Sequence, residues 1–452
     1  MWNIGLELAA LVVVGYGLTN YLGRDKIRYD RSRDYEYSLE ADWSCGCKLA
    51  AGTLEPQSAP PAEHTLLLAA RVASGPLGRL FDPRIEVVSA QGIRVHHFEP
   101  GAGGLRYVDL TPFAADLVEG RPVRIRARHC RIEPVELLAY ARPPLDNMRL
   151  MIIAPHPDDA EIAAYGMYEE HAARTSIVTV SAGENLQALK RQYIPGLDEA
   201  LPEAIMRKGQ IRAWDAHCVP RWAGVRPDDT VMLGYPNGAL KRMRKEPDQA
   251  VGHRIASSLR PDDFRRFNTI ALPSDGKATN RWSALVDDLS ALIDMKRPDA
   301  IVTPHPEIDA HADHVASTQA VEEAMGRSSH QVSHILYYAN HIRGTRNHPY
   351  GPEHGIAGLP PHFSALEPGQ RALSIPLDAE RQRRKACALY LMHDLVSPVR
   401  PMKHLRRQWR HFLRWGRLGN YGPDTYFRTA VRANELFLYR SRIPPEREGS
   451  SG

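Results

Sequence analysis

Hydrophobic and polar positions follow two different patterns along the chain, and the change falls near residue 148. Between residues 35 and 141, short apolar or alternating runs are separated by turns that contain glycine and proline. Runs of this kind are typical of antiparallel strands. They are TLLLAARV, RIEVVSA, IRVHHFE, LRYVDLT and VRIRARHC, at residues 65–72, 84–90, 93–99, 105–111 and 123–130. The pattern predicts an all-β sandwich domain over residues 35–141.

After the linker ARPPLDN (141–147), apolar strands alternate with helical segments. We expect strands at 150–155, 176–183, 230–236, 268–274 and 300–306, and helices at 160–174, 203–217 and 282–298. This alternation predicts an α/β domain over residues 148–452, with a Rossmann-like, mostly parallel sheet flanked by helices. Ligands of such sheets bind outside the carboxyl ends of the strands. Polar side chains that directly follow the strands are therefore the first candidates for a function.

A third pattern lies at the N-terminus, where residues 4–22 are apolar apart from Glu7. A membrane span requires about 20 such residues. Basic residues follow the segment and none precedes it, and a signal-peptide cleavage site is not evident. We expect residues 1–23 to be a membrane anchor, or else a hydrophobic helix packed on the protein's own surface. An anchor predicts location at the inner (cytoplasmic) membrane, with the domain 148–452 facing the cytoplasm.

The composition is that of an ordinary folded protein. Of 452 residues, 43% are hydrophobic and 25% are charged, and the net charge of +5 does not by itself indicate a nucleic-acid partner. The five cysteines are scattered, which excludes the framework of a disulfide-rich secreted domain. The lone Cys45-Gly-Cys47 has no partner cluster for a structural zinc site. We therefore expect two thiols in a strand or turn.

A basic segment lies near the C-terminus. Between Arg400 and Arg417 there are seven lysines or arginines and no acid, with aromatic side chains interleaved. This composition suits a helix on an anionic membrane surface. A site that holds an anionic substrate is a second interpretation. A solvated helix that turns its aromatic side chains into the core is a third.

Histidines and aspartates gather at two of the expected strand ends. His156, Asp158 and Asp159 follow the run LMIIAP, and the second group is HPEIDAHADH at residues 305–314. Adjacent carboxylates repel each other when ionised, and a bound cation relieves that repulsion. His311 and His314 are three residues apart, so that on a helical turn they point the same way. One sheet can bring both groups together at its edge.

The two groups together offer the ligands of a catalytic metal. A catalytic zinc takes about three protein ligands and leaves a position for water, and His156, Asp159 and His314 supply such a set. Asp158 is then a candidate general base. His311 is a candidate imidazolium that stabilises an oxyanion, and Asp313 a candidate partner that holds His311 protonated. Alternatively, these side chains only cap helices. His156 and Asp158, with a distant histidine, also match the two-His-one-carboxylate set of Fe(II) oxygenases, although an α/β domain is unusual for those enzymes.

The motifs HPDDAE and HADH resemble those of the PIG-L/LmbE-like family of zinc-dependent de-N-acetylases. The resemblance covers residues 149–390 and leaves out the β-rich region. It implies that His156, Asp159 and His314 bind zinc, that Asp158 is the general base, and that His311 stabilises the oxyanion. It also implies removal of the acetyl group from N-acetylglucosamine-containing molecules.

Weaker matches to the same family suggest substrate contacts. Glu184 ends SAGE, where the family often has Gly-Glu, and Arg207 lies where a helix arginine often contacts substrate. Asn237 in LGYPNG replaces the usual acid, Gln210 stands where Glu is common, and Asp309 stands where some members have a tyrosine. From the resemblance we predict that Glu184, Arg207 and Asn237 bind substrate.

The predicted function is that of a zinc-dependent hydrolase. Its expected substrate is an N-acetylglucosamine-type sugar in a membrane-associated glycoconjugate, such as a lipopolysaccharide core intermediate or a lipid-linked sugar. The expected membrane contacts are the N-terminal helix and the basic C-terminal segment. Hydrolysis of another small amide and a non-catalytic, membrane-surface glycan-binding role are the alternatives, because the zinc ligands alone do not specify a substrate.

Overall fold

We describe the fold from a computed structural model of the chain. The described residues are 27–277, 279–396 and 401–442, together with three single positions, Gly5, Glu7 and Gly15. Within these ranges no helix has the length and apolar character needed to cross a membrane. The hydrophobic helix predicted at residues 1–23 lies almost entirely outside them, so it stays a prediction.

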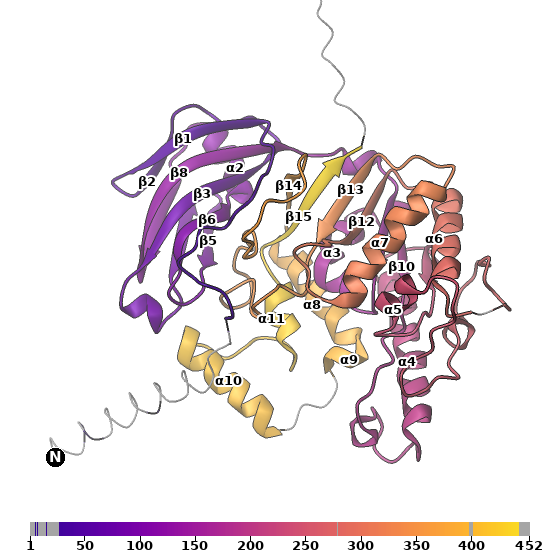
Figure 1. Cartoon of the computed structure of the whole chain (residues 1–452). Coiled ribbons are helices and arrows are strands. Elements are labelled where there is room, and N and C mark those ends of the chain that lie inside the picture. Colours follow the sequence, from indigo (N-terminus) through magenta and orange to yellow (C-terminus); the bar gives the residue numbers. More distant parts are fainter. Residues whose placement is uncertain are drawn as a thin grey trace, which may run out of the picture.

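The N-terminal region is an eight-stranded sheet in which every strand pair is antiparallel (Figure 1). Its order is β5-β4-β7-β2-β1-β8-β3-β6. The strands are β1 (Trp43–Ala50), β2 (Thr53–Pro56), β3 (His64–Ser74), β4 (Arg84–Ser89), β5 (Gly92–His97), β6 (Gly103–Asp109), β7 (Arg124–Arg128) and β8 (Cys130–Ala141). A short helix, α2 (Ala114–Val118), precedes β7.

Strand β1 belongs to both halves of this sheet. Its first half, 43–46, pairs with β8, and its second half, 47–50, pairs with β2. Leu66 and Leu68 of β3 lie in the same hydrophobic core as Ile85 and Val87 of β4. Every second residue of these strands points into that core, as the two-residue period of a strand requires. The β content is therefore as predicted, while the sandwich arrangement stays a prediction.

The second region is a mixed α/β fold built on a seven-stranded sheet in the order β11-β10-β9-β12-β13-β15-β14 (Figure 1). The strands are β9 (Leu150–Ala154), β10 (Thr175–Thr179), β11 (Thr230–Met232), β12 (Ala300–Pro304), β13 (His334–Tyr338), β14 (Arg371–Pro376) and β15 (Asn434–Ser441). Strands β9 to β13 pair in parallel, and β15 is antiparallel to both β13 and β14. The prediction of a mostly parallel sheet is confirmed.

Helices cover both faces of this sheet. The described helices of this region are α3 (Asp159–Glu170), α4 (Leu201–Trp222), α5 (Leu240–Lys245), α6 (Trp282–Lys296), α7 (Ala312–Arg327), α8 (Ala379–Leu391), α9 (His393–Val396), α10 (Pro401–Trp415) and α11 (Thr425–Ala430), of which α10 lies apart from the sheet (Figure 1). Met151 of β9 packs in one core with Leu289 of α6, whereas Ile152 packs in another with Tyr165 of α3. A strand buried on both faces has no polar alternation, which explains the unbroken apolar run at 150–154.

The segment 268–274, predicted to be a strand, is a loop. Asn268 takes the place of a strand partner at the edge of the sheet. Its side-chain oxygen accepts a hydrogen bond from the Met232 amide at 2.9 Å, and its side-chain nitrogen donates to the Met232 carbonyl at 2.9 Å. One side-chain amide therefore satisfies the end of β11, and the apolar residues that follow turn inward without pairing.

The two sheets share a core and a buried polar junction. Leu67 of β3 packs in the same hydrophobic cluster as Ala372 of β14. The Ser374 amide donates to Thr65 Oγ1 at 3.0 Å, and the Ser374 hydroxyl donates to Asp109 Oδ2 at 2.6 Å. Burial raises the pKa of Asp109 to about 6. The β-rich region is thus attached directly to the α/β sheet at strand β14.

Candidate metal centre and active site

The two His/Asp groups meet at the carboxyl edge of the second sheet, as their positions after strands predicted. The loop after β9 carries His156, the loop after β12 leads to His311 and His314, and the loop after β13 carries Asn340 and His341. Strands β9, β12 and β13 are consecutive in the sheet, so the three loops are neighbours.

Asp158 sits in a strained backbone conformation just before α3. Its φ of 107° lies in the left-handed region that side chains with a Cβ rarely adopt. Such strain is retained when the surrounding structure demands a particular side-chain direction, and it concentrates at functional sites. The strain separates the two adjacent carboxylates: Asp159 begins α3 and faces the histidines, while Asp158 faces Arg212 on α4.

His314 has the arrangement of a metal-binding histidine. It is fully buried in the first turn of α7, and its Nδ1 lies 2.9 Å from Asp309 Oδ2. Donation of the Nδ1 proton to that carboxylate leaves a lone pair on Nε2. Nε2 is buried and makes no hydrogen bond among the described residues, although it lies 3.2 Å from Asp159 Oδ2. A buried nitrogen without a partner is costly unless a cation occupies the position beside it.

Asp159 is shared by both histidines of the predicted ligand set. Its Oδ2 lies 3.3 Å from His156 Nδ1 and 3.2 Å from His314 Nε2. Ligands that each stand about 2.0–2.1 Å from a tetrahedral zinc are themselves about 3.4 Å apart. The side chain of Asn340 donates to Asp159 Oδ1 at 2.8 Å, which fixes the carboxylate. The two distances that Asp159 Oδ2 makes to His156 and His314 therefore match the spacing of ligands around a small metal ion.

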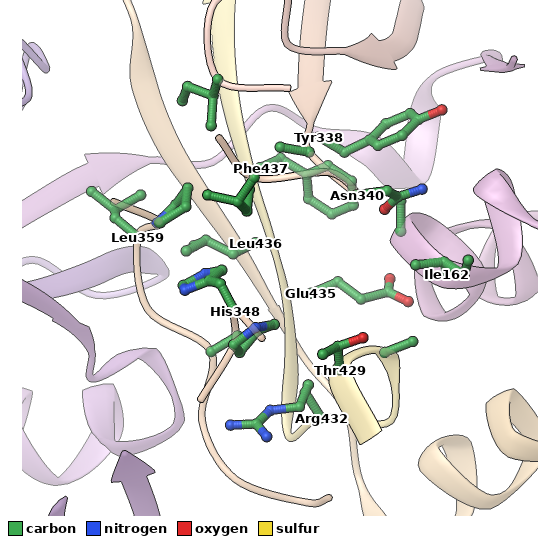
Figure 2. Close-up of a pocket in the computed structure, with 18 of the residues that line it drawn as sticks. Ile162, Tyr338, Asn340, His348, Leu359, Thr429, Arg432, Glu435, Leu436 and Phe437 are labelled. Atoms are coloured by element: carbon green, nitrogen blue, oxygen red, sulfur yellow. The ribbon is translucent and has the colours of Figure 1, made fainter. Parts of the chain in front are cut away.

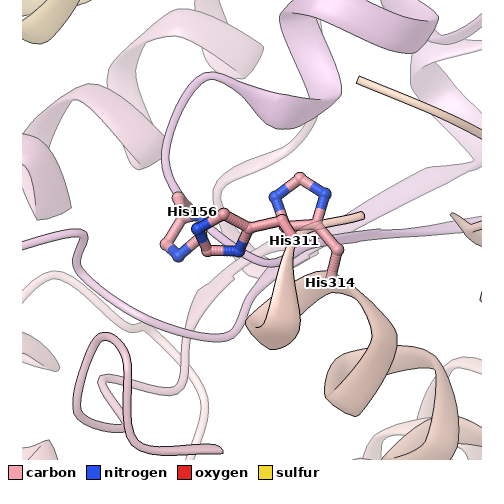
Figure 3. A group of neighbouring side chains, drawn as sticks. All are labelled: His156, His311 and His314. Carbon is pink, nitrogen blue, oxygen red and sulfur yellow. The ribbon is translucent and has the colours of Figure 1, made fainter. Parts of the chain in front are cut away.

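The structure offers two overlapping three-residue groups that could hold a metal ion. One consists of His156, His311 and His314, and the other of Asp159, His314 and His341. In each group the nearest ligand atoms lie within 4.8 Å of one another. Figure 3 shows the three rings of the first group gathered together, with centroids 4.8–5.4 Å apart. His314 belongs to both groups, so it is the centre of the site.

The site favours positive charge. Burial would lower the pKa of His156, but hydrogen bonds to Asp159 and Asp313 raise it to about 9. Burial opposes the charged form of His314 as well, and Asp159 and Asp309 outweigh it, raising the pKa to about 10. A divalent cation supplies the same positive charge without protons. The carboxylates that raise these pKa values therefore also favour metal binding.

Asp158 has the protonation behaviour expected of a general base near neutral pH. Burial raises its pKa to about 8, against the opposing effect of Arg212. Arg212 Nη2 lies 3.1 Å from Asp158 Oδ2, and Arg212 Nη1 donates to the Gly183 carbonyl at 2.9 Å. A Cβ at Gly183 would overlap Arg212 Nη1, and the φ of this residue is +63°, so only glycine lets the guanidinium reach Asp158.

His311 and Asp313 do not form the predicted pair. Asp313 Oδ2 lies 3.4 Å from His156 Nε2 and accepts a hydrogen bond from the Gly238 amide at 2.6 Å. Nδ1 of His311 is buried and has no hydrogen-bond partner among the described residues. Burial, together with the charge of nearby His156, lowers the pKa of His311 to about 4. Both effects favour the neutral ring of His311, and the oxyanion-stabilising imidazolium expected from the sequence stays a prediction.

The three residues predicted to bind substrate lie in two places. Glu184 is fully buried, and its Oε1 accepts a hydrogen bond from the Asn237 amide at 2.8 Å, so these two residues adjoin each other. Arg207 points elsewhere on α4 and pairs with Asp198 at 2.7 Å. The arginine that faces the site is Arg212, five residues further along the same helix.

Sequence reasoning missed Arg212, Asn340 and His341. Arg212 had a usable signal, because it shares one helical face with Ile205 and Gly209, and a charged residue on an apolar face needs a buried partner. Asn340 and His341 follow strand β13, which ends at the same edge as β9 and β12. Without the strand order, nothing in the sequence connects them with the HPDD motif.

A cavity of about 100 Å³ adjoins the cluster (Figure 2). Two of its lining residues contact the candidate metal ligands directly. Asn340 donates a hydrogen bond to Asp159, and the hydroxyl of Tyr426 lies 3.2 Å from His341 Nδ1. Apolar side chains, including those of Leu359, Leu436 and Phe437, form much of the remaining wall. The site therefore has space beside the ligands, and that space is mainly apolar.

Residues 151–325 match a family described as PIG-L: GlcNAc-PI de-N-acetylase. The matched segment covers less than half of the chain. It contains both motifs from which the resemblance was seen, so the resemblance is confirmed over this range. The β-rich region and the C-terminal helices lie outside the matched residues. A search of curated proteins found no match.

Solved structures similar to this chain include the conserved protein TT1542 from Thermus thermophilus, with 18% identity over 66% of this chain and 96% of that chain, at a TM-score of 0.33. An N,N'-diacetylchitobiose deacetylase from Pyrococcus horikoshii has 16% identity over 67% of this chain and 90% of that chain, at a TM-score of 0.34. The zinc-inhibited form of teicoplanin deacetylase Orf2 has 16% identity over 65% of this chain and 98% of that chain, at a TM-score of 0.32.

Proposed function

We propose that this protein is a metal-dependent hydrolase that removes the N-acetyl group from an N-acetylglucosamine-type sugar. The observation that carries the proposal is the buried ring of His314, which lies between the carboxylates of Asp159 and Asp309 in the segment that matches the PIG-L family. Its Nε2 makes no hydrogen bond among the described residues. A histidine oriented in this way is suited to bind a metal ion. In a core without a metal, a buried ring nitrogen that makes no hydrogen bond would lower the stability of the fold.

His156, Asp159 and His314 would hold the ion, and the two nitrogens and one oxygen favour zinc. Bound zinc lowers the pKa of a coordinated water toward about 7 and polarises a carbonyl oxygen. Asp309 and Asn340 act behind the ligands, the first by accepting the Nδ1 proton of His314 and the second by fixing Asp159. His311 and His341 line the same space as further nitrogen donors.

Asp158 would move the protons of the reaction. Its pKa of about 8 allows it to take a proton from the attacking water and later to give that proton to the departing amine. Arg212 holds the carboxylate in place at 3.1 Å and favours its ionised form. The neutral ring of His311 can donate one N–H to the oxygen that becomes negative in the tetrahedral transition state.

The proposed substrate is a membrane-associated glycoconjugate on the cytoplasmic side, such as a lipopolysaccharide core intermediate or a lipid-linked sugar. Three features support this placement: the apolar segment 4–22, the basic residues that follow it, and the basic segment 400–417. The apolar cavity beside the cluster gives room for a non-sugar part of such a molecule.

The test is acetate release by the purified protein from a panel of N-acetylglucosamine-bearing lipids and oligosaccharides, with zinc present and with zinc chelated. Asp158→Asn should lower turnover about 10²–10⁴-fold while the zinc content, measured by mass spectrometry, stays unchanged. The control is Asp228→Asn in the sequence Pro227-Asp228-Asp229, which repeats the Pro-Asp-Asp of the site at an exposed turn.

Full activity of Asp158→Asn would remove Asp158 from the role of base. Absence of acetate release from every member of the panel, with zinc bound, would overturn the amino-sugar proposal in favour of another amide or a binding role.

A further inference from the structure

Helix α10 exposes a stripe of large apolar side chains. Met402, Leu405, Trp409 and Phe412 are 74%, 62%, 52% and 45% exposed. At 100° per residue, their positions fall within an arc of about 80°, so they form one continuous face of the helix. Leu418, just beyond the helix end, is 58% exposed and adds to the apolar surface. Scattered exposed apolar residues are ordinary, but a contiguous patch marks an interaction site.

The rest of the protein fixes the direction in which this stripe points. On the opposite side of α10, His411 is buried, with Nδ1 2.7 Å from the Arg417 carbonyl and Nε2 3.3 Å from Glu353. The side chains of Arg414 and Trp415 both donate to Asp82 at 2.8 Å. The helix is therefore held by its polar side, and its exposed apolar stripe faces away from the body of the protein. Figure 1 shows the ribbon of α10 at the periphery of the molecule.

The charge around the stripe indicates the kind of partner. Arg406 and Arg410 follow the stripe on one flank, at helical positions about 40° and 80° from Met402. No acid occurs from residue 400 to residue 417. An apolar stripe with a basic flank complements a surface that is apolar inside and anionic outside, which describes a bilayer with acidic phospholipids.

We propose that α10 lies in the plane of a membrane that contains anionic phospholipids. Its apolar stripe inserts at the boundary between headgroups and acyl chains, and the flanking arginines contact lipid phosphates. The inference deepens the proposed function, on which it rests for its biological meaning, because it names the face of the enzyme that meets the bilayer.

The start of the described chain lies on the same side of the molecule. The Arg28 amide donates to the Gly344 carbonyl at 2.8 Å, and the Tyr29 hydroxyl lies 2.8 Å from that of Tyr350. Tyr350 lines a cavity whose other wall is α10. Residue 27, where the first continuous described range begins, is therefore close in sequence to Tyr29, whose hydroxyl contacts a residue that lines this cavity.

The metal cluster is also close to this face. The cavity beneath α10 is lined by Asp424, Thr425 and Arg428 at the start of α11. Tyr426 on the same short helix contacts His341 in the cluster. The short helix α11 therefore connects the cavity beneath α10 with the candidate metal ligands.

Hydrogen–deuterium exchange on the full-length protein tests the proposal, because it localises any lipid contact to α10 even though the segment 4–22 is present. The probes are vesicles of phosphatidylcholine alone and of an equimolar mixture with phosphatidylglycerol. We expect slower exchange over residues 402–415 only with the mixed vesicles. Leu405→Ser should lower this protection about 10- to 100-fold, and Arg406→Glu about 30-fold.

The matched control is Ile93→Ser, which removes an apolar side chain of similar exposure (59%) from strand β5. It should leave the protection of α10 unchanged. All three variants should release acetate from a water-soluble substrate at the normal rate, since none of these residues belongs to the metal cluster. Loss of that activity with α10 still protected would count against the proposed function and not against the membrane contact.

Three results would overturn the proposal. The first is unchanged exchange in α10 with the mixed vesicles. The second is equal protection by phosphatidylcholine alone, which would remove the role of the arginines. The third is protection that needs no lipid and grows with protein concentration, which would show that a second copy of the chain covers the stripe.

Discussion

The Arg265 cluster and the candidate metal centre are both buried groups of charged side chains in the α/β region, and they differ in how completely their polar atoms are hydrogen-bonded. In one, Arg265 binds Asp288 at 2.9 Å and Asp275 at 2.8 Å, and Asp288 also accepts hydrogen bonds from the hydroxyls of Tyr235 and Ser274. The other is the metal cluster, in which the buried Nε2 of His314 has no hydrogen-bond partner among the described residues.

The difference shows how burial can be used for structure or for function. Desolvation of a charge is costly, and the Arg265 cluster offsets the cost within the chain through ion pairs and hydrogen bonds. The metal cluster is left incomplete and rich in carboxylates, so an added cation completes it. Substitutions in the first cluster should therefore affect stability alone. Substitutions in the second should affect zinc binding.

The largest effect on stability is expected for Asp288→Ala. It leaves the guanidinium of Arg265 buried beside one remaining carboxylate, and the free energy of unfolding should fall by about 3–5 kcal/mol. Urea denaturation measures the loss. The control is Asp287→Ala, next in sequence, whose exposed ion pair with Arg327 should contribute less than about 1 kcal/mol. A similar loss in both variants, or a changed zinc content in folded Asp288→Ala, would contradict the contrast between the clusters.

Zinc should stabilise the wild-type protein and leave the stability of His314→Ala unchanged. At a free concentration one hundred times the dissociation constant, a ligand bound only by the folded state adds about 2.7 kcal/mol. Unfolding with zinc and with a chelator measures this difference. The control is His305→Ala, a nearby buried histidine whose ring binds Gln370 and is not part of the ligand groups. The His305→Ala protein should be less stable than the wild type, but zinc should raise its free energy of unfolding by the same amount.

A smaller effect is expected for Asp309→Asn, which acts on the metal through His314. The amide can no longer accept the Nδ1 proton as a carboxylate does, and zinc affinity should fall about 10- to 100-fold, or about 1.4–2.7 kcal/mol. Isothermal titration calorimetry with zinc measures the change. Unaltered affinity would mean that the contact of Asp309 with His314 serves only to cap the loop.

The smallest effect comes from a pair that is only half buried. Asp215 raises the pKa of His393 through a hydrogen bond of 2.7 Å, while the His393 side chain is 52% exposed. Because the folded-state pKa is raised, the stabilisation is complete below about pH 6.5 and is lost as the pH rises through the folded value. Relative to His393→Ala, the wild type should lose under about 1 kcal/mol over this interval in urea denaturation. An increase of the free energy of unfolding with pH would contradict a raised pKa of His393.

Much of the site could be predicted from the sequence because its residues are close in sequence to strand ends. His156, Asp159 and His314 meet as the motifs predicted. The protonation of His311 could not be predicted, since it depends on the three imidazoles and the burial that only the folded site supplies. The pairing of Arg207 with Asp198 could not be predicted either, because motif spacing on a helix does not reveal which residue has such a partner nearby, and the predicted substrate contact of Arg207 stays a prediction.

The fold shows the same division. Strands β9, β10 and β12 were predicted because they are continuous apolar runs, and burial on both faces requires such runs. The apolar segment 268–274 has the same local character and forms no strand, because the side chain of Asn268 already satisfies the edge of β11. Competition of this kind between a side chain and a strand is invisible in a local pattern.

The sequence by itself determined the class of the α/β domain, the two motifs and the predicted ligands, since each depends on the order and spacing of nearby residues. The tertiary structure decided which other residues contact the predicted ligands and the predicted base. Asp309 behind His314, Arg212 on Asp158, and the outward direction of the α10 stripe all depend on contacts between distant parts of the chain. The physical reason is that periodicity fixes local geometry, whereas burial and pairing are properties of the whole packed chain.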